Sequence, residues 1–126
     1  MVTRGDKLIA MCRVYAKKEG ATFEGMIGKI EKFLAAQDAD ISGRLGAIRS
    51  ELARAKEDIG LLRAIELTQS GLLIAEKAVE SIEKLGYAYT YTLEVAVYFR
   101  QKGFMVDRTE HKVSYIIREP EVDDNE

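Results

Sequence analysis

The 126-residue chain is poor in the residues that build disulfides, metal sites and irregular structure. It has one cysteine, one histidine, one proline and no tryptophan. A single cysteine cannot form a disulfide within the chain, and one cysteine with one histidine cannot complete a zinc site in one subunit. Too few prolines and glycines are present for collagen-like or proline-rich disordered proteins. We therefore expect no cofactor, no metal site and no disulfide framework.

Long apolar runs are missing as well. No stretch approaches the 18 apolar residues of a membrane span, and the first ten residues lack the apolar segment of a signal peptide. We expect no transmembrane helix and a cytoplasmic location. Hydrophobic residues make up 47% of the chain and charged residues 32%, which suits a protein with a core and long solvated helices.

The net charge of -2 is unevenly distributed. The last eight residues hold five acidic side chains and no base, whereas residues 1–118 hold all 19 basic side chains and 16 acidic ones. This weak positive excess argues against nucleic-acid binding, which needs a strongly basic patch. We interpret residues 119–126 as an acidic tail, either a solvated end or a strip that docks on a basic partner.

The N-terminal third has the pattern of two amphipathic helices. Thr3 and Asp6 have the spacing of a helix-start signal, and Gly20 suits the residue that follows a helix end. Thr22 is a good N-cap for the second helix. The apolar stripe of this helix consists of Phe23, Met26, Ile27, Ile30, Phe33 and Leu34.

A heptad pattern starts a third helical segment at Ile41. Apolar residues recur with alternating gaps of four and three residues, the spacing of a coiled coil. These residues are Ile41, Leu45, Ile48, Leu52, Ala55, Ile59 and Leu62. In a parallel coiled coil, Glu51 would face Lys56 of the neighbouring chain, and Asp58 would face Arg63. Both pairs attract, so the charges favour a parallel association of chains.

Two interpretations of this segment stay open. One is a homo-oligomer held by the heptads, with a trimer or tetramer favoured by leucine at the a positions and isoleucine at d. The other is an amphipathic helix packed within its own chain, because three heptads are the lower limit for a coiled coil. A second apolar set runs out of register from Leu61 to Ile82. We expect a helix break near residues 68–71, with Ser70 capping a further helix that ends at Leu85.

The C-terminal third has the pattern of a small αβ unit. Gly86 and Gly103 each follow a helix-like stretch and precede an aromatic residue, as at a helix end. Between them we expect a strand with three alternating tyrosines and then a short helix over residues 93–102, capped by Thr92. The alternation also continues over residues 87–99, so one long strand is the competing interpretation.

A β-hairpin is predicted to follow. Residues 104–107 and 112–118 alternate as strands do, and residues 109–112 form the turn. His111 lies at the tip of this turn, where we expect it to be solvated.

These patterns predict an α+β protein that is predominantly α. We expect residues 1–85 to form a helical region for oligomerisation or bundle packing. Residues 86–118 would form the unit of strand, helix and hairpin, and residues 119–126 the tail.

No catalytic constellation is present in the sequence, so we expect a protein that is not an enzyme. The tyrosines are the residues that most suggest a binding site, because their rings can stack on a nucleotide base while arginine or lysine binds its phosphates. The candidate ligand-binding residues are Tyr87, Tyr89, Tyr91, Tyr98, Arg100, Lys102 and Arg108. The alternative is that tyrosine is only a favoured strand residue.

The Gly-Tyr strand, the Tyr-Thr-Leu-Glu helix start and the Gly-Phe-x-Val hairpin of the C-terminal third resemble the ends of small proteins of tailed bacteriophages. The resemblance implies a virus-encoded accessory or structural protein that acts by binding, in the host cytoplasm or in the virion. We therefore predict a non-catalytic homo-oligomer that serves as an assembly or adaptor component with a protein partner. The alternative is an oligomer that sequesters a nucleotide ligand at a subunit interface.

Overall fold

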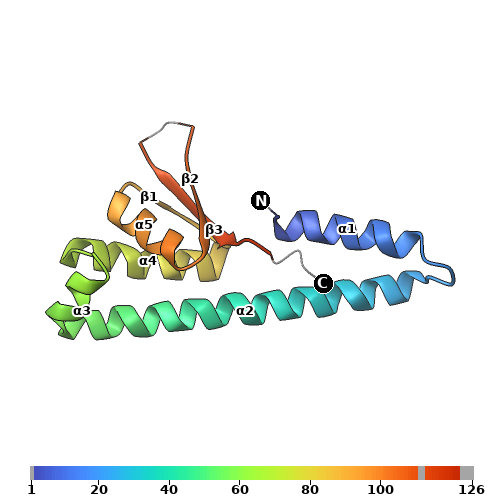
Figure 1. Cartoon of the computed structure of the whole chain (residues 1–126), viewed down its shortest axis with the longest axis horizontal. Coiled ribbons are helices and arrows are strands. Elements are labelled where there is room, and N and C mark those ends of the chain that lie inside the picture. The colour runs from blue at the N-terminus through green and yellow to red at the C-terminus, as the bar shows by residue number, and fades with distance from the viewer. Residues whose placement is uncertain (1, 111–112, 123–126) are drawn as a thin grey trace. The chain divides into compact units, whose positions relative to one another are not determined.

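The computed structural model of the chain describes residues 2–110 and 113–122. Its helices are α1 (Arg4–Ala16), α2 (Phe23–Glu57), α3 (Ile59–Ala64), α4 (Gln69–Leu85) and α5 (Leu93–Gln101). Its strands are β1 (Tyr87–Thr90), β2 (Phe104–Arg108) and β3 (Tyr115–Pro120) (Figure 1). The prediction of an α+β, mainly helical chain is confirmed.

The chain divides into two compact units. The first comprises residues 1–41 and 121–126, and the second comprises residues 42–120. The division falls inside α2, so this 35-residue helix contributes its first part to one unit and its second part to the other. The sequence suggested a division after residue 85 instead, because it treats all the helices before the first strand as one region.

The predicted acidic tail begins inside the sheet. Glu119 and Pro120 are the last two residues of β3. In the first unit, the N–H of Val122 donates to the carbonyl oxygen of Val2 at 3.0 Å, which joins the two chain ends. Residues 123–126 lie outside the described part of the chain.

The first unit is a helical hairpin with the predicted local signals. Thr3 and Asp6 form a capping box, in which each side chain accepts a hydrogen bond from the other residue's backbone N–H. The hydrogen bond from the backbone N–H of Thr3, followed by the contribution of the Thr3 hydroxyl, holds the pKa of the Asp6 carboxyl below its usual value. Gly20 adopts a φ of 76° in the turn, and Thr22 accepts from the N–H of Gly25 at the start of α2.

The two helices of this hairpin run antiparallel (Figure 1). Near the turn, the hydroxyl of Tyr15 lies where a Cβ on Gly25 would be, so the glycine permits the close approach. Towards the other end, Arg4 donates to the carboxylate of Asp38 at 2.9 Å.

α2 is one uninterrupted helix, whereas the sequence suggested separate helices after Thr22 and from Ile41. No proline lies between these points, and Gly43 and Gly46 are both helical. A glycine in a helix interior costs only about 1 kcal/mol relative to alanine, which the packing of the rest of the helix can offset. The two amphipathic stripes therefore belong to one helix.

A break that the heptad pattern hides comes directly after Glu57. Asp58 leaves the helical conformation, with φ of -131° and ψ of 101°, and its side chain accepts from the N–H of Leu61 as the N-cap of α3. Ile59 and Leu62 therefore lie on α3 and not on the heptad helix.

The expected break near residues 68–71 is present, with a different cap. Thr68 is the N-cap of α4 and accepts from the N–H of Gly71, whereas Ser70 lies within the helix. The helix ends at Leu85, as predicted, and Gly86 follows it with a left-handed φ of 83°.

The second unit contains a three-stranded antiparallel sheet in the order β1-β3-β2. The helix α5 lies between β1 and β2 in the chain, so the interpretation with a short helix is confirmed over the single long strand. The second hairpin strand starts at Tyr115, later than predicted, and continues to Pro120.

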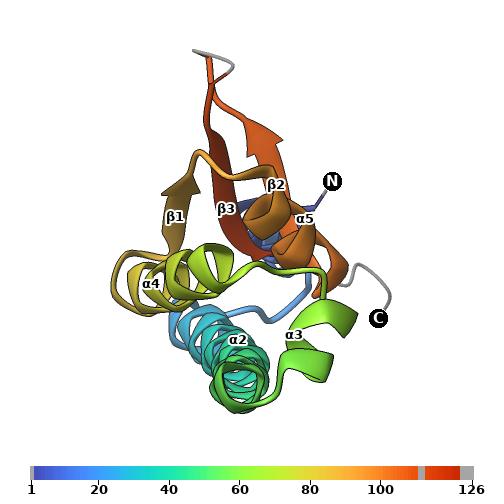
Figure 2. The ribbon, with the colours of Figure 1, turned by 90° about the vertical axis from the view of Figure 1, so that its left-hand side faces the viewer.

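The two faces of this sheet differ. On the inner face, Ala88, Val106 and Ile117 share one register row and are buried. Both α4 and α5 lie against this sheet (Figures 1 and 2). On the outer face, Tyr89 and Arg118 are exposed.

The core of the second unit is formed by α2, α4, α5 and the inner face of the sheet. Its largest fully buried side chains are Tyr98, Phe99, Leu52, Ile117, Val79 and Val95. The ring of Phe99 packs edge-on against Tyr98 and Phe104, with centroid separations of 5.6 Å in both pairs. A rigid aromatic core therefore supports the sheet from within.

Candidate functional site

The predicted oligomer stripe is part of the core of the second unit. Leu45, Ile48 and Leu52 are 2%, 3% and 0% exposed, and Leu62 is buried as well. This is the packing within one chain that the sequence left open as the alternative to a coiled coil. Pairing two chains through this stripe would require these side chains to leave the core. The preference for trimers and tetramers, which rests on these positions, loses its basis.

The basic neighbours of the stripe also have partners inside the unit. Arg49 pairs with Glu83 and Lys56 pairs with Glu76, each at 2.8 Å. Both glutamates belong to α4. Lys56, which the heptad pattern paired with Glu51 of a neighbouring chain, therefore faces a helix of its own chain.

The other predicted interface residues are scattered by the helix breaks. Ile41 is half-buried at the boundary of the two units, and Asp58 caps α3. Ile59 is 62% exposed and borders an apolar hollow of about 210 Å³ between α3 and the ends of α2 and α4. Arg63 is exposed near the end of α3.

Glu51 joins Tyr98 and Lys102 in a partly buried polar cluster. The hydroxyl of Tyr98 donates to Glu51 at 2.7 Å, and the ammonium of Lys102 lies 2.8 Å from the same oxygen. Burial raises the pKa of Glu51, but the hydrogen bonds from Lys102 and Tyr98 outweigh it, so the pKa lies below its usual value. Burial, together with the bond to the carboxylate, raises the pKa of Tyr98 well above its usual value.

Three of the predicted ligand-binding residues therefore lie away from the other tyrosines. Tyr98 is 2% exposed, so its ring cannot stack on a ligand. Lys102 is held by Glu51, and Arg100 donates to the carbonyl oxygen of Val106 at 3.0 Å. These three side chains connect α5 to α2 and to β2.

The outer face of the sheet gathers the remaining tyrosines. The rings of Tyr87 and Tyr89 meet edge-on, 5.5 Å apart, and Tyr91 follows β1 with 77% of its surface exposed. The register places Arg118 opposite Tyr87 and Ile116 opposite Tyr89. We call these five residues the tyrosine face.

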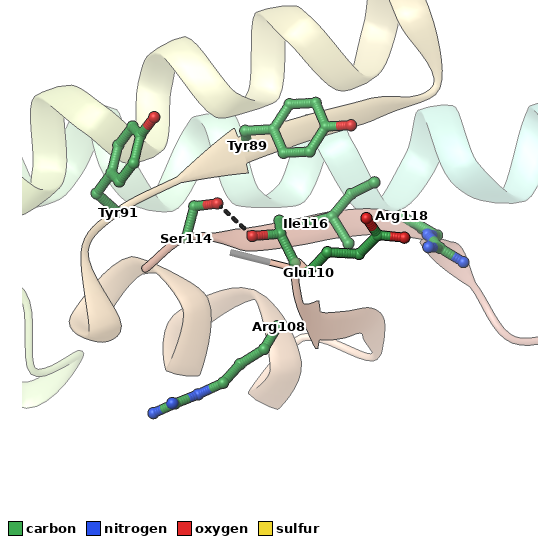
Figure 3. A pocket seen from close by; sticks show the side chains of 8 residues that line it. Tyr89, Tyr91, Arg108, Glu110, Ser114, Ile116 and Arg118 are labelled. Carbon is green, nitrogen blue, oxygen red and sulfur yellow. Dashed lines mark hydrogen bonds between the residues drawn. The ribbon is translucent and has the colours of Figure 1, made fainter. Parts of the chain in front are cut away.

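A hollow of about 630 Å³ lies over this face (Figure 3). Its lining residues are Tyr89, Tyr91, Arg108, Thr109, Glu110, Ser114, Ile116 and Arg118. At one side of it, the side-chain oxygens of Thr109 and Ser114 lie 2.7 Å apart, and the N–H of Thr109 donates to the carbonyl oxygen of Ser114. These bonds hold the ends of β2 and β3 together beside the hollow.

Two arginines border the hollow, and they point in different directions. The side chain of Arg108 points away from the tyrosines, and its guanidinium lies 5.6 Å from the ring of Tyr115 (Figure 3). Arg118 is exposed on the tyrosine face. Sequence reasoning missed Arg118, although the alternation of residues 116–118 already places it on the same face as Ile116.

The tyrosine face and its hollow offer a partner both apolar contact area and charges of either sign. The tyrosine rings present broad apolar surfaces with a hydroxyl at the tip, and Arg118 and Glu110 add charges of opposite sign. Within residues 2–110 and 113–122, no three histidine, cysteine or acidic side chains lie close enough together to hold a metal ion. His111, predicted at the hairpin tip, lies outside the described residues.

A smaller hollow of about 150 Å³ lies in the first unit. Lys18 and Lys29 stand 5.9 and 5.2 Å from the centre of the Tyr15 ring, within reach of cation–π attraction. Lys7 and Val14 of α1 line the same hollow. We call this side of the hairpin its basic side.

In the part of the chain that the structure describes, no helix combines the length and apolar character needed to cross a membrane. No protein-family model, curated protein or solved structure matches the chain. The resemblance to bacteriophage proteins therefore stays a prediction.

Proposed function

We propose that the chain is a non-catalytic binding protein that serves as an adaptor in a larger assembly, and that its tyrosine face contacts a protein partner. One observation carries this proposal. Tyr87, Tyr89 and Tyr91 are 39%, 60% and 77% exposed on a sheet face that no described helix of the second unit covers. Tyrosine is enriched at protein interfaces because its ring buries a large area and its hydroxyl finds a hydrogen-bond partner.

The resemblance of the C-terminal third to small bacteriophage proteins agrees with this role. It adds to the proposal a viral origin and a place in the host cytoplasm or in the virion. The rigid core beneath the sheet supports the same role, because a preorganised surface loses little entropy when a partner binds.

A displayed library of random peptides tests the proposal, because it samples many partner sequences at once. The full chain is the bait, and the double variant Tyr89→Ser/Tyr91→Ser is the counter-selection bait. We expect enriched peptides to bind the wild type at least about tenfold more tightly than the double variant, because stacked aromatic contacts dominate such interfaces.

The matched control is Val14→Ser, which removes an exposed apolar side chain from the first unit and leaves the sheet unchanged. Peptides that bind Val14→Ser as they bind the wild type support the proposal. Failure to enrich any peptide, or equal binding to the double variant, contradicts it.

A nucleotide ligand is the second candidate function. The volume of about 630 Å³ lies within the range of small-molecule sites, and Arg118 stands beside aromatic rings that can stack on a base. In this version of the nucleotide hypothesis, Arg118 takes the phosphate-binding role that the sequence assigned to Arg100, Lys102 and Arg108.

Thermal unfolding with ATP, GTP and NAD at about 1 mM tests this candidate, because a ligand that binds only the folded state raises the midpoint. We expect a rise for the wild type and none for Arg118→Ala or Tyr89→Ser. The absence of a rise with every nucleotide removes this candidate and leaves the protein-partner proposal standing.

A further inference from the structure

The three-stranded sheet of the second unit has two free edges, and the two edges differ. The strand order β1-β3-β2 places β1 at one edge and β2 at the other (Figure 2). Each edge strand has a row of backbone N–H and C=O groups that no strand of the sheet pairs. Such a row binds an extended peptide by adding it to the sheet as a further strand.

The hydrogen bonds of the hairpin show which residues of β3 bond to each neighbouring strand. The N–H of Thr109 donates to the carbonyl oxygen of Ser114, so these two residues form a hydrogen-bonded pair. Hydrogen-bonded and non-hydrogen-bonded pairs alternate along antiparallel strands. In β3, Ile116 and Arg118 therefore bond to β2, whereas Ile117 bonds to β1.

The same alternation identifies the backbone groups at the free edge of β1. Ala88 pairs with Ile117, so its N–H and C=O point to β3. Tyr87 and Tyr89 therefore point theirs to the free edge. The hydroxyl of Ser81 on α4 agrees with this direction, because it donates to the carbonyl oxygen of Tyr87 at 2.8 Å. Tyr89 keeps one N–H and one C=O that no described strand of the sheet takes up.

The free edge of β2 is protected. Val106 points its carbonyl oxygen away from β3, where it accepts from the guanidinium of Arg100 at 3.0 Å. The pairing of β2 is also irregular, because its register shifts between Phe104 and Met105. Both features hinder the addition of a strand at this edge, whereas β1 stays open at Tyr89.

We propose that the free edge of β1 binds an extended, acidic segment of the partner protein, which adds to the sheet as a fourth strand. The backbone of this segment forms two hydrogen bonds with Tyr89, one with its N–H and one with its C=O. Side chains of the segment alternate between the ring of Tyr89 on the outer face and α4 on the inner face. The inference rests on the proposed function, since it states how the partner of the tyrosine face binds.

The side of α4 beside this edge offers apolar contacts to an added strand. Ser81 marks this side of the helix through its bond to Tyr87. At 100° per residue, Ile74 and Leu85 lie within about 40° of Ser81 around the helix. Leu85 is 63% exposed and Ile74 is half-buried, so both are accessible to the inner side chains of the segment.

The charges on this side of α4 favour an acidic segment. Lys77 and Lys84 lie within about 60° of Ser81, whereas Glu80 lies about 100° away. Both lysines are exposed, and neither forms an ion pair with another described residue. A second copy that paired through its own β1 would bring the same two lysines to this place. Like charges therefore oppose self-pairing, and opposite charges favour an acidic partner.

Two substitutions of Tyr89 separate the backbone from the ring. Peptides enriched on the full chain are the probes, and fluorescence anisotropy measures their binding. Tyr89→Ser removes the ring and keeps the N–H at the edge, whereas Tyr89→Pro removes both. Proline is accepted at an edge position whose N–H faces outward, and circular dichroism checks the fold of each variant. We expect the proline variant to bind at least about tenfold more weakly than the serine variant, because only proline lacks the edge N–H.

Methylated probes test the same hydrogen bonds without changing the protein. A single N-methyl group is moved along the enriched peptide, one position at a time. We expect binding to weaken by at least about tenfold at the position whose N–H donates to Tyr89. The positions on either side are expected to tolerate the methyl group, because their N–H groups point away from the edge. These probes decide the question even if the proline variant unfolds.

Charge substitutions test the acidic character of the segment. We expect Lys77→Glu to weaken peptide binding by about threefold to tenfold, because it replaces an attraction at the edge by a repulsion. Lys32→Glu makes the same change at an exposed position of α2 in the first unit and is expected to leave binding unchanged. Added salt should weaken binding to the wild type more than binding to Lys77→Glu.

The outcomes distinguish this inference from the proposed function. Peptides that need the tyrosine rings, yet bind both Tyr89 variants equally or tolerate a methyl group at every position, would overturn the added strand and leave the proposed function standing. Equal effects of Lys77→Glu and Lys32→Glu would overturn the acidic segment. If no peptide is enriched, both proposals fail. A mass above 14.1 kDa without peptide, lost in Tyr89→Pro, would assign the edge to a second copy and overturn the inference.

Discussion

The two parts of α2 carry the same apolar pattern but have different surroundings. In the second unit, α2 is joined to α4 and α5, and Leu52 of the stripe is fully buried. In the first unit, the one other described helix is α1, and Phe23 stays largely exposed. A heptad or amphipathic pattern therefore shows that a helix face needs cover, but the pattern alone does not show which segment provides it.

The difference also explains how charge patterns can mislead. Lys56 suits Glu51 of a facing chain in a parallel coiled coil, and it suits Glu76 of α4 equally well. Ion pairs across neighbouring helices have the same geometry within one chain and between two chains. Burial of the apolar side chains decides between the two cases.

The largest expected effect is a truncation in the covered part of the stripe. We expect Leu52→Ala to lower the free energy of unfolding by about 2–5 kcal/mol, because it leaves a cavity in a close-packed core. Leu34→Ala, in the uncovered part, is expected to cost about 1 kcal/mol or less in the monomer. Urea unfolding at a low protein concentration measures both, and equal losses would remove the contrast between the two parts.

Much of the fold was predictable because its signals are local. The Thr3–Asp6 capping box, the end of α4 before Gly86 and the short helix between β1 and β2 each depend on neighbouring residues. The break at Asp58 was missed because an alternation of apolar residues continues across it. The apolar spacing predicts a continuous helix here, whereas the side chain of Asp58 stabilises a new helix start by accepting from the N–H of Leu61. In the structure the helix breaks at this cap.

The candidate site was less predictable because it depends on pairings between distant segments. The tyrosines of β1 were identified from their alternation, but their neighbour Arg118 comes from β3 and is fixed by the register of the sheet. Tyr98 looked like the other tyrosines in sequence, yet the helical turn of α5 directs it into the core. Exposure and register are tertiary properties that spacing along one segment does not contain.

The next effect concerns the polar cluster that fixes α5 to the covered part of α2. We expect Tyr98→Phe to lower the free energy of unfolding by about 1–2 kcal/mol, because the partly buried Glu51 loses one hydrogen bond. The matched control is Tyr91→Phe, whose exposed hydroxyl is expected to contribute nothing measurable. An equal effect of the two substitutions would show that the cluster does not stabilise the unit.

The same cluster predicts a dependence on pH. The folded-state pKa of Glu51 lies below its unfolded value, so its contribution to stability is present above the unfolded pKa. The contribution is lost as the pH falls through the folded pKa. We expect Glu51→Gln to be less stable than the wild type at pH 7, and the difference to shrink below about pH 4.3. A difference that stays constant down to pH 2 would contradict this account.

Two glycine substitutions compare the end of a helix in the second unit with the interior of a helix in the first unit. Gly86→Ala is expected to cost about 1–2 kcal/mol, because alanine is strained at the left-handed φ of 83°. Gly28→Ala, in the exposed first part of α2, is expected to stabilise the chain by about 0.5–1 kcal/mol. Thermal unfolding midpoints that shift in the same direction for both would contradict the assignments.

The smallest expected effect belongs to the ion pairs at the surface of the covered stripe. The side chain of Arg49 is 56% exposed beside Glu83, so Arg49→Gln is expected to change the free energy of unfolding by about 0.5 kcal/mol or less. A loss as large as that of Leu52→Ala would mean that charge, and not burial, holds α2 to α4.

Hydrogen exchange along α2 at several protein concentrations tests the central claim most directly. We predict that the amides of residues 45–57 are protected at every concentration, because the chain itself covers this part of the helix. The amides of residues 23–41 and of α1 should exchange more quickly than these at every concentration, because no apolar side chain of this hairpin is fully buried among its described residues. Equal protection of both parts of α2 at all concentrations would contradict the account.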